Sequence, residues 1–314
     1  MKKIMQKIVS IVIGGILITA LITGCQEKRT ANTDSAPKGS FPVTISDVYA
    51  SKITVEKEPQ RIVALAPSIV EVLYKLGLQD KIVGITEYCD YPIEAKSKNK
   101  VGDFNGVNIE KIIEAKPDIV LAGSGMSKEL FQKLTDLKIN VMVAEARTVA
   151  QIPETFTMIG KATGCEDKAN ELANELTKNI DKIRSKVKDA KKIKTYYVLS
   201  FGKDGNWTSG KGTFISDLIG ISGGENISDD VESWKEYSLE KIVEKDPDTI
   251  LISGMIANGS KDILNNEKGY KDTSAVKDGK VIILDDNLTQ RPGPRIVEGL
   301  LLIAKAIHPE LFDK

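Results

Sequence analysis

Large aromatic side chains at loop positions are the residues of this sequence best suited to bind a ligand. Aromatic residues make up only 5% of the chain, so the places where they gather are informative. Phe104 precedes Asn108 by the same spacing as Trp234 precedes Ser238, and similar segments follow both. Large rings in a pre-formed cleft suit a bulky, flat or amphipathic ligand. We expect such a cleft to be lined by these two rings and by Tyr88, Tyr91, Trp207 and Tyr237. The alternative is that some of these rings are core residues that pack under loops.

Two acidic residues form a second matched pair. Glu71 and Asp217 each precede a glycine, Gly77 or Gly223, by the same spacing. Two acids at equivalent places would suit docking to basic sockets on a partner protein. The alternative is that each acid lies on an ordinary solvated helix face.

Arg291 is a candidate ligand contact. It lies in the segment Gln290–Arg295, where proline and glycine stiffen the backbone before a predicted helix. A guanidinium group there could bind an amide, a carboxylate or a phosphate. A salt bridge at the helix start is an equal alternative for Arg291 and the favoured interpretation for Arg295.

The sequence contains no recognisable catalytic constellation. His308 is the single histidine, and it follows the last predicted helix, so a catalytic triad and a histidine-rich zinc site are both disfavoured. Glycine pairs such as Gly223-Gly224 match no phosphate-binding loop. We therefore expect no catalytic cofactor, no metal site and no enzymatic activity. The 44 basic and 44 acidic residues balance, which argues against a nucleic-acid partner.

The first 24 residues are interpreted as an export signal. Lys2, Lys3 and Lys7 precede an apolar run from Ile8 to Ile22, which as a helix would span roughly 22 Å, less than a bilayer core. The run ends in Thr23-Gly24-Cys25, which looks like a bacterial lipobox. We expect Cys25 to be lipid-modified and to anchor an extracytoplasmic protein. The alternatives are an ordinary cleaved signal or an uncleaved anchor.

Cys89 and Cys165 are expected to be free, buried thiols.

The elements that position these residues come from a unit that occurs twice. The segments 109–121 (IEKIIEAKPDIVL) and 239–251 (LEKIVEKDPDTIL) each read as a capped helix, a Pro-Asp break and a buried strand. Strands alternate with helices around both copies, which predicts parallel sheets covered on both faces. The segment 148–194 instead carries two long amphipathic stripes. The fold class is therefore α/β, with two Rossmann-like lobes joined by a single long connecting helix.

The domain organisation follows from these patterns. We expect the protein to be a monomer. Its parts are predicted as a signal peptide (1–24), a lipidated cysteine and flexible tether (25–42), an N-terminal α/β lobe (43–147), a helical connector (148–194) and a C-terminal α/β lobe (195–314).

From residue 43 to the end, the chain resembles the substrate-binding proteins of ATP-driven importers, specifically the class that binds cobalamin and ferric siderophores. The motifs that carry this resemblance are Glu58–Val63, Ala66–Ser68 with Glu71, Tyr88–Pro92, Val101–Phe104, the two repeated units, Gly223–Ile227 and Arg291–Arg295. The Tyr88–Pro92 loop and the Gly102–Phe104 segment are most similar to cobalamin-binding members.

The resemblance implies a function. Aromatics matching Tyr91, Phe104 and Trp234 would line a corrinoid cleft, and acids matching Glu71 and Asp217 would meet arginines of a permease. The expected protein captures cobalamin or a related corrinoid and delivers it to an ABC permease and its ATPase. The alternatives are a ferric-siderophore or haem binder of the same class, and, from another class, an exported enzyme.

Overall fold

The computed structural model describes residues 41–49, 51–103, 106–256 and 259–312. The predicted signal peptide, nearly all of the predicted tether with Cys25, and Phe104 lie outside these ranges. The two lobes described below belong to one compact unit.

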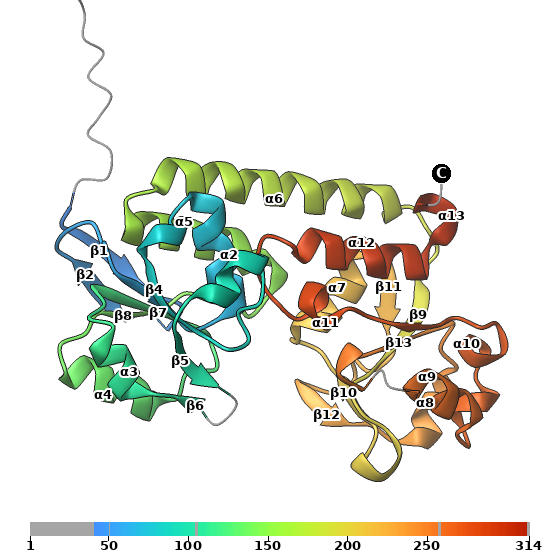
Figure 1. Ribbon diagram of the computed structural model, residues 1–314. Coiled ribbons are helices and arrows are strands. Elements are labelled where there is room, and N and C mark those ends of the chain that lie inside the picture. Colours follow the sequence, from blue (N-terminus) through green and yellow to red (C-terminus); the bar gives the residue numbers. More distant parts are fainter. Residues whose placement is uncertain (1–40, 50, 104–105, 257–258, 313–314) are drawn as a thin grey trace, which may run out of the picture. The chain divides into compact units, whose positions relative to one another are not determined.

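The N-lobe is built on a six-stranded sheet with the strand order β6-β5-β4-β3-β7-β8 (Figure 1). All neighbouring strands are parallel except β5 and β6, which are antiparallel. The strands are β3 (Ile62–Ala64), β4 (Ile82–Thr86), β5 (Lys100–Asp103), β6 (Gly106–Val107), β7 (Ile119–Ala122) and β8 (Val141–Val143). Its helices are α2 (Pro67–Leu76), α3 (Ile109–Glu114) and α4 (Lys128–Asp136), with 3-10 turns at 79–81 and 93–97.

Helices cover both faces of this sheet, as the alternation of strands and helices predicts. Along β3, Ile62 and Ala64 belong to the core cluster that also holds the buried residues of α2. Val63 points the other way, into a cluster with Ile112 of α3 and Leu134 of α4. Successive side chains of a strand face opposite sides, so a sheet buried on both faces needs uninterrupted apolar strands.

The repeated unit forms as the sequence predicts in both lobes. Helix α8 (Leu239–Lys245) and strand β13 (Thr249–Ile252) correspond to α3 and β7. The side chains of Asn108 and Ser238 cap the two helices, accepting hydrogen bonds from the third backbone N–H that follows.

The aspartates of the two Pro-Asp breaks perform a function that the sequence pattern did not reveal. The Asp118 carboxylate accepts hydrogen bonds from the backbone N–H groups of Gln60 and Arg61, at 2.8 and 2.9 Å. The Asp248 carboxylate accepts one from Lys194 at 3.1 Å. Each acid therefore ties the amino end of its strand to the start of the neighbouring strand, β3 in one lobe and β9 in the other.

The C-lobe contains a parallel four-stranded sheet with the order β11-β9-β13-β14. Beside it lies a two-stranded antiparallel ribbon, β10-β12, which the sequence analysis missed. The strands are β9 (Ile193–Val198), β10 (Trp207–Ser209), β11 (Gly224–Asn226), β12 (Trp234–Glu236), β13 and β14 (Val281–Ile283). The further helices are α7 (Phe214–Ile221), α9 (Ser260–Asn266), α10 (Ser274–Lys277), α11 (Asp286–Thr289), α12 (Ile296–Ile307) and α13 (Pro309–Phe312), with 3-10 turns at 202–204, 254–256 and 270–272.

Two helices connect the lobes after a 3-10 turn at 149–151: α5 (Ile152–Thr163) and the 22-residue α6 (Glu166–Val187). Their buried residues follow the two stripes seen in the sequence. A Cβ placed on Gly160 of α5 would lie only 2.3 Å from the Ala169 Cβ of α6, so glycine permits their close contact. Figure 1 shows α6 as the long green helix, packed against α5 and against α12 of the C-lobe. One core cluster contains residues of both sheets, α6 and α12. The predicted α/β fold with a long connecting helix is confirmed.

The N-terminal hairpin pairs β1 (Val43–Ser46) with β2 (Lys52–Val55), two segments whose alternation of apolar and polar residues is typical of such strands. The turn of this hairpin contains no glycine, and the side chain of Asp47 stabilises it instead. The Asp47 carboxylate accepts hydrogen bonds from the backbone N–H groups of Tyr49 and Ser51, at 2.9 and 2.8 Å. Asp47 is itself buried.

The structure differs from the sequence interpretation at several residues outside the sheets. Serine often caps helices, and Ser68 after Pro67 would be expected to cap α2. It does not, because Ala66 occupies the N-cap position without a side-chain hydrogen bond and the Ser68 hydroxyl donates to Glu145 instead. His308 is buried and is the C-cap residue of α12, a helix-capping place that suits its position after the last predicted helix, and its ring contacts the Gly223 carbonyl. Cys89 and Cys165 are free, but only Cys89 is fully buried.

Candidate ligand-binding cleft

A cavity of ≈ 600 Å³ lies at the carboxyl ends of the N-lobe strands. We call it the N-lobe cavity. Parallel sheets commonly bind ligands at this edge, because loops leave all the strands there together. The residues that follow or end β3, β4, β7 and β8 all contribute to its wall, namely Leu65–Pro67, Thr86, Gly123 and Glu145.

The wall of the N-lobe cavity combines apolar side chains with acids. Val107, Met126 and Leu130 supply part of its apolar surface, and Tyr88 adds a phenol ring. The acidic residues of the wall are Asp103, Glu129 and Glu145, and the basic one is Lys133. Lys133 forms an ion pair with Glu129 at 2.7 Å. Carboxylates thus outnumber cations among the described residues of this wall, which gives it an acceptor-rich, negative character.

Glu145 lies at the boundary between this cavity and a second one. Its carboxylate accepts hydrogen bonds from the Ser68 hydroxyl at 2.9 Å and from the Ser124 backbone N–H and hydroxyl, at 2.8 and 3.0 Å. These donors hold the carboxylate in one orientation. A Cβ on Gly123 would lie 2.9 Å from the Glu145 carboxylate, so a larger residue there would displace the carboxylate from this orientation.

The second cavity has a volume of ≈ 290 Å³ and is lined by both lobes, so we call it the inter-lobe cavity. The N-lobe supplies Ser124, Glu145 and Arg147, and the C-lobe supplies Trp234 and the first residues of α7. Trp234 is 38% exposed. Its ring packs edge-on against Tyr197, with 6.0 Å between centroids.

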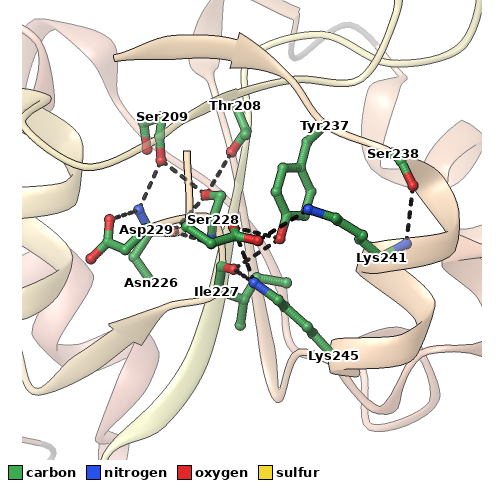
Figure 2. A network of polar contacts seen from close by, with 11 residues as sticks. Thr208, Ser209, Asn226, Ile227, Ser228, Asp229, Tyr237, Ser238, Lys241 and Lys245 are labelled. Atoms are coloured by element: carbon green, nitrogen blue, oxygen red, sulfur yellow. Dashed lines mark hydrogen bonds and ion pairs between the residues drawn. The ribbon is translucent and has the colours of Figure 1, made fainter. Parts of the chain in front are cut away.

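A polar network supports the loop that leads to Trp234 (Figure 2). Asn226 donates to the Ser209 carbonyl at 2.8 Å, and the Ser228 hydroxyl donates to the same carbonyl at 2.9 Å. Tyr237 donates from its hydroxyl to Asp230 at 2.8 Å. Hydrogen bonds between buried polar groups hold a segment in one conformation. The network thus fixes both strands of the ribbon that carries Trp234.

Lysines of the repeated unit complete this network. Lys241 and Lys245 of α8 approach the Asp230 carboxylate at 3.2 and 3.1 Å. Partial burial favours the neutral acid, but hydrogen bonds from Tyr237, Lys245 and Lys241 outweigh it and lower the pKa of Asp230 to about 2. Asp230 is therefore ionised at any physiological pH.

Two further ion pairs join the lobes, and we call them the inter-lobe ion-pair cluster. Arg295 binds the Glu71 carboxylate with two hydrogen bonds, at 3.0 and 2.6 Å, and Arg291 binds Asp90 at 2.6 Å. The Tyr91 ring lies over the Arg295 guanidinium, 3.8 Å from its centroid. Glu71 is 3% and Arg295 15% exposed. Bidentate pairing of this kind is both strong and geometrically specific.

The electrostatics of the cluster follow from burial. Burial raises the pKa of Glu71 above its usual value, and the hydrogen bond and charge of Arg295 oppose this only in part. Partial burial also acts on Asp90, but there the hydrogen bond and charge of Arg291 prevail and lower the pKa. Arg295 thus favours the charged form of Glu71, against the effect of burial.

The residues predicted to bind a ligand occupy several different places. Tyr88 lines the N-lobe cavity and Trp234 the inter-lobe cavity. Trp207 is exposed on β10 and lines neither cavity, Tyr237 is buried, and Tyr91 and Arg291 belong to the inter-lobe ion-pair cluster. Arg295 forms the salt bridge that the sequence favours. Ligand contacts by these residues and by Phe104 stay predictions.

The predicted docking acids also differ from each other. Asp217 on α7 is half-buried and accepts a hydrogen bond from the Val149 backbone N–H at 3.2 Å. Burial raises the pKa of Asp217, and the nearby Asp229 charge adds to the effect. Glu71, by contrast, is engaged with Arg295 inside the protein. A docking contact by Glu71 would require this ion pair to open.

Sequence reasoning missed Glu145, Arg147 and the ends of β7 and β8 as lining residues. A usable signal was present, because Glu145 and Arg147 follow an apolar strand segment at the sheet edge that binds ligands.

Among the described residues, no group of three or more His, Cys, Asp and Glu could hold a metal ion. The described helices include none that is long and apolar enough to cross a bilayer.

Comparison with known proteins defines the class. Residues 62–288 match the model of a family described as periplasmic binding protein. The chain is 33% identical to an uncharacterized ABC transporter substrate-binding lipoprotein, YvrC, of Bacillus subtilis, over 95% of this chain and 96% of that one. It is 31% identical to a cobalamin-binding protein of Halobacterium salinarum, over 86% of this chain and 75% of that one. The crystal structure of a possible iron-binding, periplasmic solute-binding protein of Staphylococcus epidermidis is 33% identical, with a TM-score of 0.72, over 80% of this chain and all of that one.

The chain belongs to the periplasmic binding protein family. It is a solute-binding protein of ABC transport and not an enzyme, as the sequence predicts.

The inter-lobe ion-pair cluster yields a stability prediction. Arg295→Met should lower the free energy of unfolding at pH 7 by ~3–5 kcal/mol, because it leaves Glu71 buried without its cation. The pKa of Glu71 in the folded variant should rise further, so that its stability falls as the pH increases from 5 to 8. Urea unfolding at several pH values measures both effects.

The double variant Glu71→Gln/Arg295→Met is the matched control. It removes the buried charge together with its partner, so it should recover part of the loss and flatten the pH dependence. An equal loss in the single variant at pH 5 and pH 8 would show that Glu71 is not the cause.

Proposed function

We propose that this protein captures cobalamin or a related corrinoid in the cleft formed by its two cavities and delivers it to an ABC permease. The observation that carries the proposal is the wall of the N-lobe cavity. Among the described residues, this wall is apolar with carboxylate acceptors, and Lys133, the one basic side chain there, is paired with Glu129. A corrin ring is large and apolar, and its peripheral amide groups are hydrogen-bond donors that such acceptors satisfy.

The relatives support the proposal at the level of class. The Halobacterium salinarum protein of similar sequence is described as cobalamin-binding. The similar Staphylococcus epidermidis structure is described as a possible iron-binding protein, which keeps a ferric complex as the second candidate.

A ferric siderophore or haem fits the cavity walls less well. Anionic ligands would need converging cations, whereas the N-lobe cavity carries Asp103 and Glu145. Haem iron bound by a tyrosine needs the ionised phenol. Tyr88 is the tyrosine of this wall, and burial together with the charges of Asp103 and Glu87 raises its pKa, which disfavours the ionised form.

Titration of the purified full chain, kept in mild detergent, tests the proposed ligand. Cyanocobalamin, several ferric siderophores and haem are added separately, and binding is followed by calorimetry. We expect one-to-one binding of cyanocobalamin and no response to the iron compounds. Heat with a ferric complex and none with cyanocobalamin would overturn the ligand and leave the transport class standing.

A substitution at Trp234 extends this test to the cleft. Trp234→Ala should weaken corrinoid binding about tenfold or more, because a stacked ring contributes ~0.5–1.5 kcal/mol beyond the area that it buries. Adding Phe104→Ala should weaken it further. Phe312→Ala, which removes a ring that contacts Lys186 near the C-terminus, is the control and should have no effect. Unchanged affinity in the Trp234 variant would place the ligand elsewhere.

Delivery to a permease is the second part of the proposal, with Asp217 as the more accessible docking acid. Asp217→Asn keeps an oxygen that can accept the Val149 hydrogen bond but removes the charge. Uptake by cells should fall up to about fivefold with ligand affinity unchanged, since an exposed ion pair contributes ~0.2–1 kcal/mol. Asp262→Asn, on the exposed side of α9, should change neither. If ligand affinity falls and uptake falls no further than this loss of affinity explains, the docking contact is rejected.

Anchoring by a lipid on Cys25 completes the proposed function. Cys25→Ser should release the protein from the membrane fraction into the medium or periplasm, as immunoblots of cell fractions would show. Retention of this variant in membranes would favour an uncleaved anchor instead.

A further inference from the structure

The inter-lobe cavity differs in charge from the N-lobe cavity that it adjoins. Its wall is polar, with the hydroxyl groups of Ser124, Thr213 and Ser233 and the amide of Gln290. Arg147 is the basic residue in this wall. The N-lobe cavity, on the other side of Glu145, is acidic. A ligand that fills both cavities therefore meets acceptors at one end and a cation at the other.

Arg147 is held in place without being neutralised. Its guanidinium lies over the Tyr49 ring, 4.8 Å from the centroid, and the Tyr49 hydroxyl donates to the Ser124 carbonyl at 2.8 Å. The Arg147 backbone N–H donates to the Gln151 side chain at 3.0 Å. These contacts orient the residue from both ends, and stacking on a ring leaves the in-plane N–H donors of a guanidinium available.

No carboxylate among the described residues forms an ion pair with Arg147. The nearest acid along the chain, Glu145, already accepts hydrogen bonds from Ser68 and Ser124. Arg291 and Arg295, in contrast, are both paired with acids of the N-lobe. Arg147 is thus the arginine near the cleft that remains available to an anionic group of a ligand.

We propose that Arg147 binds the phosphodiester of the nucleotide loop of a complete corrinoid, and so distinguishes complete from incomplete corrinoids. The inference rests on the proposed function. The corrin ring carries neutral amides, whereas the nucleotide loop carries a phosphodiester with one negative charge. A guanidinium pairs with phosphate oxygens through two parallel hydrogen bonds. The hydroxyl groups of Ser124 and Thr213 in the same wall offer further donors.

The contrast between the two cavities then orients the ligand. The amide-bearing ring meets the carboxylates of the N-lobe cavity, and the phosphodiester meets Arg147 in the inter-lobe cavity. The first turn of α7 also lines the inter-lobe cavity. The N-terminal end of a helix carries a partial positive charge, which adds to the charge of Arg147. Glu145 lines both cavities, so the orientation is decided by Asp103 at one end and Arg147 at the other, and the reverse orientation would place the phosphate near Asp103 and away from Arg147.

Affinities of the full chain and of Arg147→Gln for two corrinoids test the assignment. Cobalamin and cobinamide are compared in excess cyanide, so that both carry two cyanide ligands and differ in the nucleotide loop. The substitution should weaken cobalamin binding about ten- to a hundredfold, the usual range for a hydrogen bond to a charged group. Cobinamide binding should change less than about threefold. Cobinamide phosphate, which keeps a phosphate and lacks the base, should respond as cobalamin does.

Two controls separate ligand binding from structural effects. Arg184→Gln removes an exposed arginine of α6 and should change neither affinity. The salt dependence of cobalamin affinity should be smaller in Arg147→Gln than in the unsubstituted protein, because a charge contact is missing.

The outcomes that overturn the inference are distinct from failure of the proposed function. Equal losses for cobalamin and cobinamide would show that Arg147 only supports the fold, and no loss for either would show that it does not contact the ligand. Either result rejects the assignment while the unsubstituted protein still binds corrinoids. Absence of corrinoid binding by the unsubstituted protein would reject the proposed function, and the assignment with it.

Discussion

A shared apolar core is the constraint on which the rest of the structure depends. Residues of both sheets, α6 and α12 bury their side chains in one cluster, so the lobes cannot move far apart without exposing apolar surface to water. The Glu71–Arg295 ion pair adds a directional contact next to this core. This ion pair specifies one arrangement of the two lobes, because separating its partners would leave the buried Glu71 charge without solvent or a counterion. The two cavities exist as a pair because this arrangement is held.

Within that arrangement, the charged residues divide into two groups. Arg291 and Arg295 neutralise acids of the other lobe and thereby hold the lobes together. Glu145 and Arg147 line the cavities, and each is oriented by neighbours, Ser68 and Ser124 for the acid and Tyr49 for the base. A binding protein needs both groups, because a ligand of mixed polarity is recognised only when the recognising groups are fixed in advance.

Much of the fold could be predicted from the sequence because its signals are local. The repeated capped helix and strand, the hairpin and the two stripes of the connector all depend on residues close together in the chain. The ribbon β10-β12 was missed, since its strands are short and its exposed Trp234 and Lys235 lack an alternating apolar pattern. The site was harder to predict for a different reason. Arg291 and Arg147 are both arginines in loops, and only their distant neighbours, Asp90 for one and Tyr49 for the other, decide which is available to a ligand.

The aspartates of the two Pro-Asp breaks have a consequence for how such a scaffold can diversify. Asp118 and Asp248 tie strands together at the amino ends of the sheets, whereas the cavities open at the carboxyl ends. In the N-lobe, strand alignment and ligand contact are therefore encoded at opposite edges of the sheet. Substitutions in the cavity walls alter recognition while strand alignment is preserved. A gene of this kind can acquire a new cargo through a handful of loop changes, with little risk to folding.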